Sequence, residues 1–184
     1  HEHYNYWSLT SLVTFFKRFS AVIYKAEKID THGGSIRIYI KKDPKTIIER
    51  SVKSLLSEEE TFGIKNYKTY QNFANKVYKI RDNVRTNILK LKKNNKKIIG
   101  YGSPAKATTA LNFFGISKEI DLIVEDNKFK QGKFLPGMKI PITSKENLKG
   151  KADCALVLAW NFFDEIKKKN SDLARKLINI KDLE

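Results

Sequence analysis

The residue types best suited to binding chemistry lie together in Gly100-Tyr101-Gly102-Ser103-Pro104-Ala105-Lys106. An apolar strand precedes this stretch, and a helix is expected to begin with Ser103 as its N-cap and Pro104 at its first position. The two glycines allow a tight turn and close approach of a ligand. Free N–H groups at a helix start, together with Lys106 in the first turn, favour an anion. The stretch therefore predicts a phosphate site.

The same residues support a second interpretation. Gly100-x-Gly102-x-x-Ala105, followed by the acidic pair Glu125 and Asp126 after the next predicted strand, matches a dinucleotide fingerprint. Taken alone, this pattern favours an NAD-binding fold. Lys106 instead favours a ligand with exposed phosphate. A glycine turn that binds nothing is the third alternative.

A candidate acid–base pair lies at the start of the chain. An imidazole that titrates near neutrality is a suitable proton acceptor, and Glu2 beside His3 could orient it. Exposed polar residues at a terminus would give the same pattern. His1, Glu2 and His3 have no further ligand at a metal-like spacing, so no metal site is predicted.

Composition limits the class of protein. The chain has 184 residues, of which 41% are hydrophobic, enough for one domain or for one domain and part of another. No apolar run is long enough for a membrane span, and no signal peptide is recognised at the start. Cys154 is the single cysteine, which fits a cytoplasmic location, and its apolar surroundings predict a small buried side chain in a strand.

The formal net charge of +16 does not predict a nucleic-acid partner. Of 36 basic residues only six are arginines, although the guanidinium fork is the group that phosphate and base recognition favours. The lysines are spread over the whole chain. No RNA-binding motif or zinc-finger spacing accompanies them. We therefore expect neither a nucleic acid nor a membrane as partner.

The first half of the chain is predicted to hold a helix with one apolar face, a pair of strands and then further helices. The first helix is expected at 9–19 and the two strands at 21–29 and 35–40. The further helices are expected at 43–56, from a short second start at 57–60, and at 66–94. The first helix and the paired strands cannot bury their own apolar faces. They are expected to need a partner sheet that the chain does not contain.

The second half alternates strands and helices, which predicts an α/β, Rossmann-like, mostly parallel sheet with flanking helices. Strands are expected at 98–101, 120–124, within 132–143 and at 155–160, and helical segments at 104–113, 144–148 and 162–177. Ligands of such sheets bind at the carboxyl ends of the strands. The candidate substrate-binding residues at this edge are Gly100, Tyr101, Gly102, Ser103, Lys106, Trp160 and Asn161.

Several motifs in order along the chain resemble the sugar C-methyltransferase family. They are Glu2-His3 with Tyr6-x-Ser8-Leu9-x-Ser11-Leu12, His32-Gly33-Gly34-Ser35-Ile36-Arg37, the Gly100–Lys106 stretch, Glu125-Asp126-Asn127-x-x-Lys130-Gln131-Gly132, Leu135-Pro136-Gly137 and Leu158-Ala159-Trp160-Asn161. Members of this family use S-adenosylmethionine to methylate a carbon of a sugar, typically a nucleotide-linked deoxysugar. The resemblance implies that His3 is the general base and that Glu2 orients it.

The resemblance also implies a division of the chain. Residues 1–42 are expected to be the last helix and hairpin of a class I methyltransferase domain, 43–95 a helical connector, and 96–184 the Rossmann-like C-terminal domain. S-adenosylmethionine is expected to bind an upstream domain, and zinc only a missing N-terminal part. The chain would then be a fragment that does not methylate alone.

Two alternatives from other classes remain at this point. One is an NAD-dependent module built on residues 100–105. The other is a non-catalytic interaction domain, for example a homo-oligomer, that docks through the apolar stripe of the helix between Tyr67 and Leu91.

Overall fold

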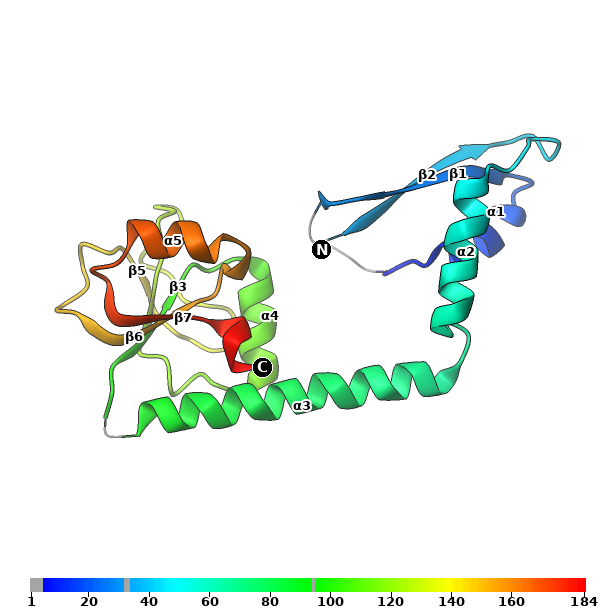
Figure 1. The fold of residues 1–184 in the computed structure, drawn as a ribbon. Helices are drawn as coiled ribbons and strands as arrows, with labels where there is room; N and C mark the ends of the chain where they lie inside the picture. Colours follow the sequence, from blue (N-terminus) through cyan, green and yellow to red (C-terminus); the bar gives the residue numbers. More distant parts are fainter. Residues whose placement is uncertain (1–4, 32–33, 94) are drawn as a thin grey trace. The chain divides into compact units, whose positions relative to one another are not determined.

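A computed structural model describes residues 5–31, 34–93 and 95–184. The chain forms two compact units, His1–Phe73 and Ala74–Glu184, and the division falls inside the long helix α3, Tyr67–Lys92. Figure 1 shows the order of the elements along the chain. The two compact units are defined by contacts within the chain, which do not test how its segments are related to other proteins. The division into residues 1–42, 43–95 and 96–184 therefore stays a prediction.

The first unit holds α1 (Leu9–Lys17), the antiparallel strands β1 (Val22–Ile29) and β2 (Ser35–Lys41), and α2 (Arg50–Phe62). Among its described residues, a buried hydrophobic cluster consists of Leu9, Ile23, Ala26 and Val52. Because Val52 belongs to α2, the chain itself covers part of the hairpin. The partner sheet that the sequence predicts for this piece stays a prediction.

The predicted helix start at Asp43-Pro44 is wrong, since α2 begins only at Arg50. The Asp43 carboxylate instead accepts a hydrogen bond from the Lys45 N–H at 3.0 Å, and the Thr46 N–H donates to the Asp43 carbonyl. Such a local turn competes with helical hydrogen bonds. The second start predicted at Ser57 is also wrong, because α2 continues through it.

The second unit contains a five-stranded sheet in the order β5-β4-β3-β6-β7, and every pair is parallel. The strands are β3 (Ile98–Tyr101), β4 (Leu122–Val124), β5 (Ile142–Thr143), β6 (Ala152–Val157) and β7 (Ala174–Asn179). The predicted α/β sheet with Rossmann-like character is confirmed.

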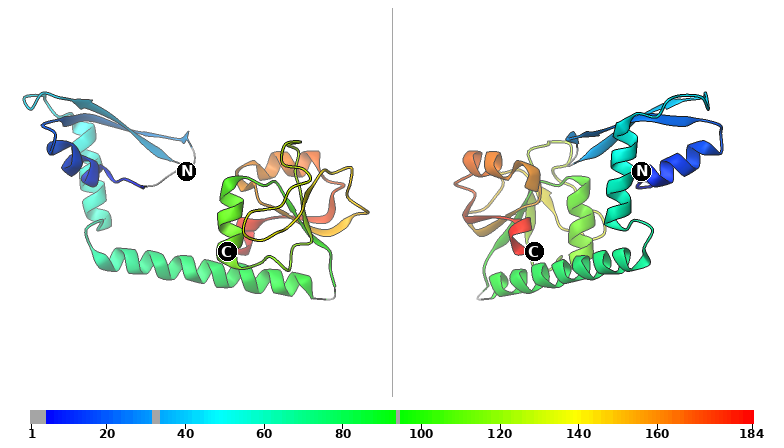
Figure 2. Two further views of the ribbon diagram at one scale, coloured as in Figure 1. Left: turned by 180° about the vertical axis from the view of Figure 1, so that it is seen from behind. Right: turned by 45° about the vertical axis from the view of Figure 1, so that its right-hand side comes forward.

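Helices cover both faces of this sheet. On one face α4 (Ala105–Phe114) and the C-terminal half of α3 pack on β-strand residues such as Ile98 and Leu156. On the other face lies α5 (Phe163–Lys169), whose Ile166 packs against a smaller cluster around Ile99. Figure 2 shows α4 and α5 on different sides of the sheet. Val84 and Ile88 of α3 belong to the first face and are fully buried.

The end of the chain differs from the sequence prediction. A single helix over 162–177 was expected, but α5 ends at Lys169 and β7 follows. Asn170 is the C-cap of α5, and Leu173 and Ala174 are buried against the sheet. Strand pairing of β7 with β6 therefore outweighs local helix preference. Residues 144–148 form a turn instead of the predicted helical segment.

Cys154 is buried in β6, as predicted, and burial raises the pKa of its thiol to about 11. This environment suits a small core side chain and not a nucleophile. Among the helices of the described ranges, none combines the length and apolar character of a bilayer-crossing segment.

Candidate functional site

A cavity of about 330 Å³ lies at the carboxyl edge of the parallel sheet. Three segments form it: the end of β3 with the following turn, the residues after β4, and α5 with its approach. Its lining includes Tyr101, Gly102, Ser103, Pro104, Glu125, Asp126, Lys130, Ala159, Phe162, Glu165, Ile166, Lys169 and Asn170. The carboxyl ends of parallel strands meet at one edge, so residues more than twenty positions apart in sequence line one cavity.

Ser103 does not cap the helix as the sequence predicted. The N-cap of α4 is Pro104, without a side-chain hydrogen bond. Instead Ser103 turns to Glu125: its N–H donates to Glu125 Oε2 at 2.8 Å and its hydroxyl donates to the same oxygen at 2.6 Å. A charged carboxylate is the stronger acceptor for both groups, which explains the change of partner.

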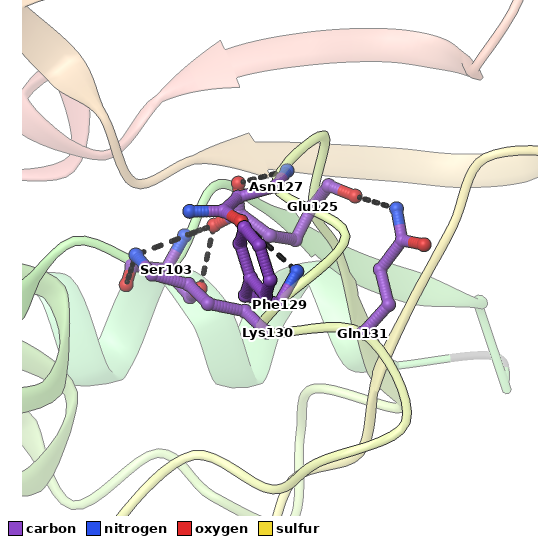
Figure 3. A network of polar contacts seen from close by, with 6 residues as sticks. All are labelled: Ser103, Glu125, Asn127, Phe129, Lys130 and Gln131. Carbon is purple, nitrogen blue, oxygen red and sulfur yellow. Dashed lines mark hydrogen bonds and ion pairs between the residues drawn. The ribbon is translucent and has the colours of Figure 1, made fainter.

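Glu125 is the centre of a polar network that Figure 3 shows from close by. Its Oε1 accepts the Asn127 N–H at 3.0 Å, and Lys130 Nζ lies 3.8 Å from Oε2 while donating to the Ser103 carbonyl at 2.9 Å. Burial alone would raise the pKa of this carboxyl group. The hydrogen bonds from Ser103 and Asn127 and the charge of Lys130 outweigh burial and hold the pKa of Glu125 below its ordinary value.

The Glu125 carboxylate disfavours binding of a phosphate at the glycine turn. A phosphate at the Ser103 N–H would have to displace Glu125 and would be repelled by its charge. The same argument applies to a dinucleotide, whose pyrophosphate would need this amide. The geometry therefore favours groups other than phosphate at this end of the turn.

Tyr101 links the turn to α5. Its hydroxyl donates to Asp126 Oδ2 at 2.7 Å and accepts a hydrogen bond from Asn170 Nδ2 at 3.1 Å. Burial, and then the neighbouring Asp126, raise the pKa of Tyr101 well above its ordinary value. The phenol therefore stays protonated and acts as a donor.

Gly100 and Gly102 are required for different structural reasons. Gly100 lies inside β3, where a Cβ atom would come within 2.9 Å of Leu158 Cδ1 and 3.0 Å of Ile123 Cγ1. Packing accounts for this glycine. Gly102 has a φ of 83°, in the left-handed region, and a Cβ would lie 3.2 Å from the Cβ of Ala159. The turn itself requires this second glycine.

Lys106 and Trp160 form a separate pair. Lys106 Nζ lies 4.1 Å from the centroid of the Trp160 ring, and neither residue lines the cavity. Desolvation, and then the charge of Lys181, lower the pKa of Lys106. Asn161 is exposed and does not line the cavity either. Of the predicted substrate-binding residues, Tyr101, Gly102 and Ser103 line the cavity, and Lys106 and Trp160 form a separate pair. Gly100 and Asn161 belong to neither group.

The predicted acid–base pair, Glu2 and His3, lies outside the described residues. Within residues 5–31, 34–93 and 95–184, no group of three or more His, Cys, Asp or Glu side chains is arranged to hold a metal ion.

Sequence reasoning missed the contribution of α5 to the cavity. Phe162, Glu165, Ile166, Lys169 and Asn170 all line it. A signal was present, because asparagine is a frequent residue at helix ends and Asn170-Ser171-Asp172 reads as a turn. Asp126 entered the prediction as part of a dinucleotide fingerprint and of the family motif, and Lys130 only as part of the family motif.

Comparison with known proteins places these residues in context. A family described as the C-methyltransferase C-terminal domain matches residues 30–179. The chain is also 35% identical over 169 residues to the C-methyltransferase NovU of Streptomyces niveus. That alignment covers 90% of this chain and 40% of NovU, so the chain spans about two fifths of the length of this curated relative.

Proposed function

The chain belongs to the family of C-methyltransferase C-terminal domains, and from this membership we propose that it is the substrate-side portion of an S-adenosylmethionine-dependent C-methyltransferase. The proposed substrate is a nucleotide-linked keto sugar. The observation that carries the proposal is the family match over residues 30–179, within which the sheet presents a polar cavity at its ligand-binding edge.

His3 is proposed as the general base. Its imidazole would take the proton from the sugar carbon beside the keto group, which requires a base that titrates near neutrality. Glu2 would orient the imidazole and stabilise its charged form. The carbon nucleophile that results can then accept a methyl group.

S-adenosylmethionine would supply that methyl group when bound. The turn after β3 does not fit it as a nucleotide loop, because the Glu125 carboxylate already accepts hydrogen bonds from Ser103. We therefore propose that the methyl donor, and any zinc, bind to a part of the enzyme outside this chain.

The proposed contacts to the substrate come from two places. Tyr101, Gly102 and Ser103 contribute the wall of the cavity, and Gly100 allows the strand beneath them to pack closely. Lys106, with Trp160 and the neighbouring Asn161, offers a cation and an aromatic ring to the phosphates and base of a nucleotide.

The test of His3 uses the intact enzyme and two readouts. In His3→Ala we expect turnover to fall by a factor of about 10²–10⁴, the usual contribution of a general base. Exchange of deuterium from solvent into the carbon beside the keto group, followed by NMR without methyl donor, should be lost as well. Calorimetric binding of S-adenosylmethionine should stay nearly unchanged.

The control is His1→Ala, which changes a second histidine two positions away and should keep both activities. Full deuterium exchange and full turnover in His3→Ala would show that His3 is not the general base. Failure of the unaltered enzyme to methylate any nucleotide-linked keto sugar would overturn the substrate class.

A further inference from the structure

The charges that line the cavity do not suit an anion. Three carboxylate side chains, Glu125, Asp126 and Glu165, stand against two lysines. Both lysines are already engaged: Lys130 with the Ser103 carbonyl and Glu125, and Lys169 with Glu165 at 2.6 Å. Among the residues that line the cavity, no cation is left over for a phosphate.

The cavity instead offers hydrogen-bond acceptors. Asp126 accepts from Tyr101 through Oδ2, and within the described chain its Oδ1 accepts no hydrogen bond. Asn170 is only 6% exposed and donates through Nδ2 to Tyr101 and to the Ile166 carbonyl. No described residue donates a hydrogen bond to its Oδ1. Because Asn170 lines the cavity and this oxygen keeps its capacity as an acceptor, it is suited to a donor from a ligand.

An apolar surface completes the wall. Phe162 lines the cavity and is 61% exposed, and Ile166 lies beside it in the lining. Ligand sites commonly combine apolar and aromatic side chains with a few polar groups that fix orientation. A sugar ring has the matching surface, with apolar C–H groups on its faces and hydroxyl donors around its edge.

We propose that this cavity binds a sugar ring through its hydroxyl groups, with Asp126 and Asn170 as acceptors and Phe162 against a ring face, while the diphosphate stays outside. Its volume of about 330 Å³ lies at the lower end of ligand pockets, which suits one ring better than a whole nucleotide sugar. The assignment rests on the proposed sugar-nucleotide substrate and says which part of it this site takes. Hydroxyl donors could come from the transferred sugar or from the ribose.

The test is an NMR titration of this chain with four separate probes. Methyl α-D-glucopyranoside represents the transferred sugar, uridine the ribose, thymidine a pentose without the 2′-hydroxyl, and inorganic pyrophosphate the anion. We expect saturable shifts of the Ser103, Asp126 and Asn170 amide signals with at least one of the first two probes. Glucoside binding alone would assign the transferred sugar, and uridine binding in preference to thymidine would assign the ribose. Saturable shifts with pyrophosphate and none with the sugars would overturn the proposal.

Two variants locate the site. Asp126→Asn keeps the shape but removes the charged acceptor, and should weaken sugar binding about tenfold. Phe162→Ala removes an exposed side chain that the core does not need, so it should weaken binding and leave the fold intact. The matched control is Asp164→Asn, an exposed acid of α5 outside the lining, which should bind like the unaltered chain. Unchanged affinity in both test variants would contradict the assignment.

The outcomes separate this inference from the proposed function. If the intact enzyme methylates a nucleotide-linked keto sugar equally well with and without Asp126→Asn, the cavity is not the sugar site and the function stands. If the chain binds sugars in the cavity but the intact enzyme methylates no nucleotide-linked sugar, the function fails and the site stands.

Discussion

At the scale of single residues, Glu125 holds the carboxyl edge of the sheet together. It accepts hydrogen bonds from the Ser103 N–H and hydroxyl and from the Asn127 N–H, and it lies close to Lys130. These contacts join the turn after β3 to the residues that follow β4. The ionised carboxylate is the stronger acceptor for these hydrogen bonds, in line with its lowered pKa.

Replacement of the Glu125 carboxylate should change how the free energy of unfolding depends on pH. Because the folded pKa of Glu125 is lowered, its stabilisation is present above the ordinary value of 4.5 and is lost as the pH falls through the lowered value. Glu125→Gln should lower the free energy of unfolding by about 1–3 kcal/mol at pH 7, and by less as the pH falls below 4. Urea unfolding at pH 7, 4 and 3 measures this, with Asp164→Asn as control. An equal loss at each pH would contradict the role of the charge.

Lys106 gives a second prediction at this scale. If its cation contacts the phosphates of the substrate, Lys106→Ala should weaken binding of a nucleoside diphosphate by about 1–3 kcal/mol. Calorimetric titration measures the change. Lys118→Ala, which removes an exposed lysine without an ion-pair partner in the described chain, controls for the lower net charge. Equal affinities of the two variants for the nucleoside diphosphate would show that Lys106 does not contact its phosphates.

At the scale of elements, α1 depends on a residue from another helix. Glu59 of α2 accepts hydrogen bonds from the Leu9 and Thr10 N–H groups at 2.7 Å each, and Ser8 and Ser11 add a capping box. A carboxylate at a helix N-terminus satisfies free N–H groups and favours the helix dipole. The position of α1 on the hairpin is therefore set by α2.

Loss of this contact should destabilise the first unit. Glu59→Ala leaves two N–H groups of α1 without their acceptor, and should cost about 1–3 kcal/mol of unfolding free energy. Glu60→Ala is the matched control, since its exposed side chain makes no hydrogen bond within the described residues. Denaturant unfolding followed at Trp7, which precedes α1, measures the difference. Equal stability of the two variants would show that the cap is dispensable.

At the scale of the whole molecule, the two units differ in the size of their hydrophobic cores. Among the described residues, the first unit has a buried cluster of four hydrophobic side chains, whereas the sheet of the second buries side chains on both faces. Since burial of apolar surface is the main source of stability, we expect the units to unfold separately, the first at lower denaturant.

The two tryptophans make this measurable. Trp7 lies in the first unit and Trp160 in the second, so Trp160→Phe reports the first transition and Trp7→Phe the second. The midpoint in urea should be lower for the chain that retains Trp7. Coincident midpoints, with the same slope, would mean that the chain unfolds as one cooperative unit.

The oligomer alternative also belongs to this scale. The stripe from Tyr67 to Leu91 was considered as a docking surface, but Val84 and Ile88 are fully buried within the second unit. This half of the stripe is therefore core. Tyr67, Tyr70 and Phe73 are exposed, and whether the protein self-associates stays a prediction.

Local sequence by itself determined the type of most elements. The alternation in Ser35–Lys41, the three- and four-residue steps of Tyr67–Lys92 and the left-handed Gly115 that ends α4 are signals carried by neighbouring residues. The motifs also sufficed to predict the family. They point to the carboxyl edge of β3 as a candidate site, and a cavity lies there. Such features depend on backbone preference and periodicity, which a single segment contains.

Tertiary structure decided which groups meet. Ser103 reads locally as an N-cap, but its partner is Glu125, 22 positions further along, and the anion site expected from the turn becomes a carboxylate contact. Residues 174–177 were predicted as the end of a helix, but they belong to a strand because β6 offers an edge to pair with. Asn170 enters the cavity only because α5 ends there. Local preferences are worth a fraction of a kcal/mol per residue, so hydrogen bonds to a distant charge or strand outweigh them.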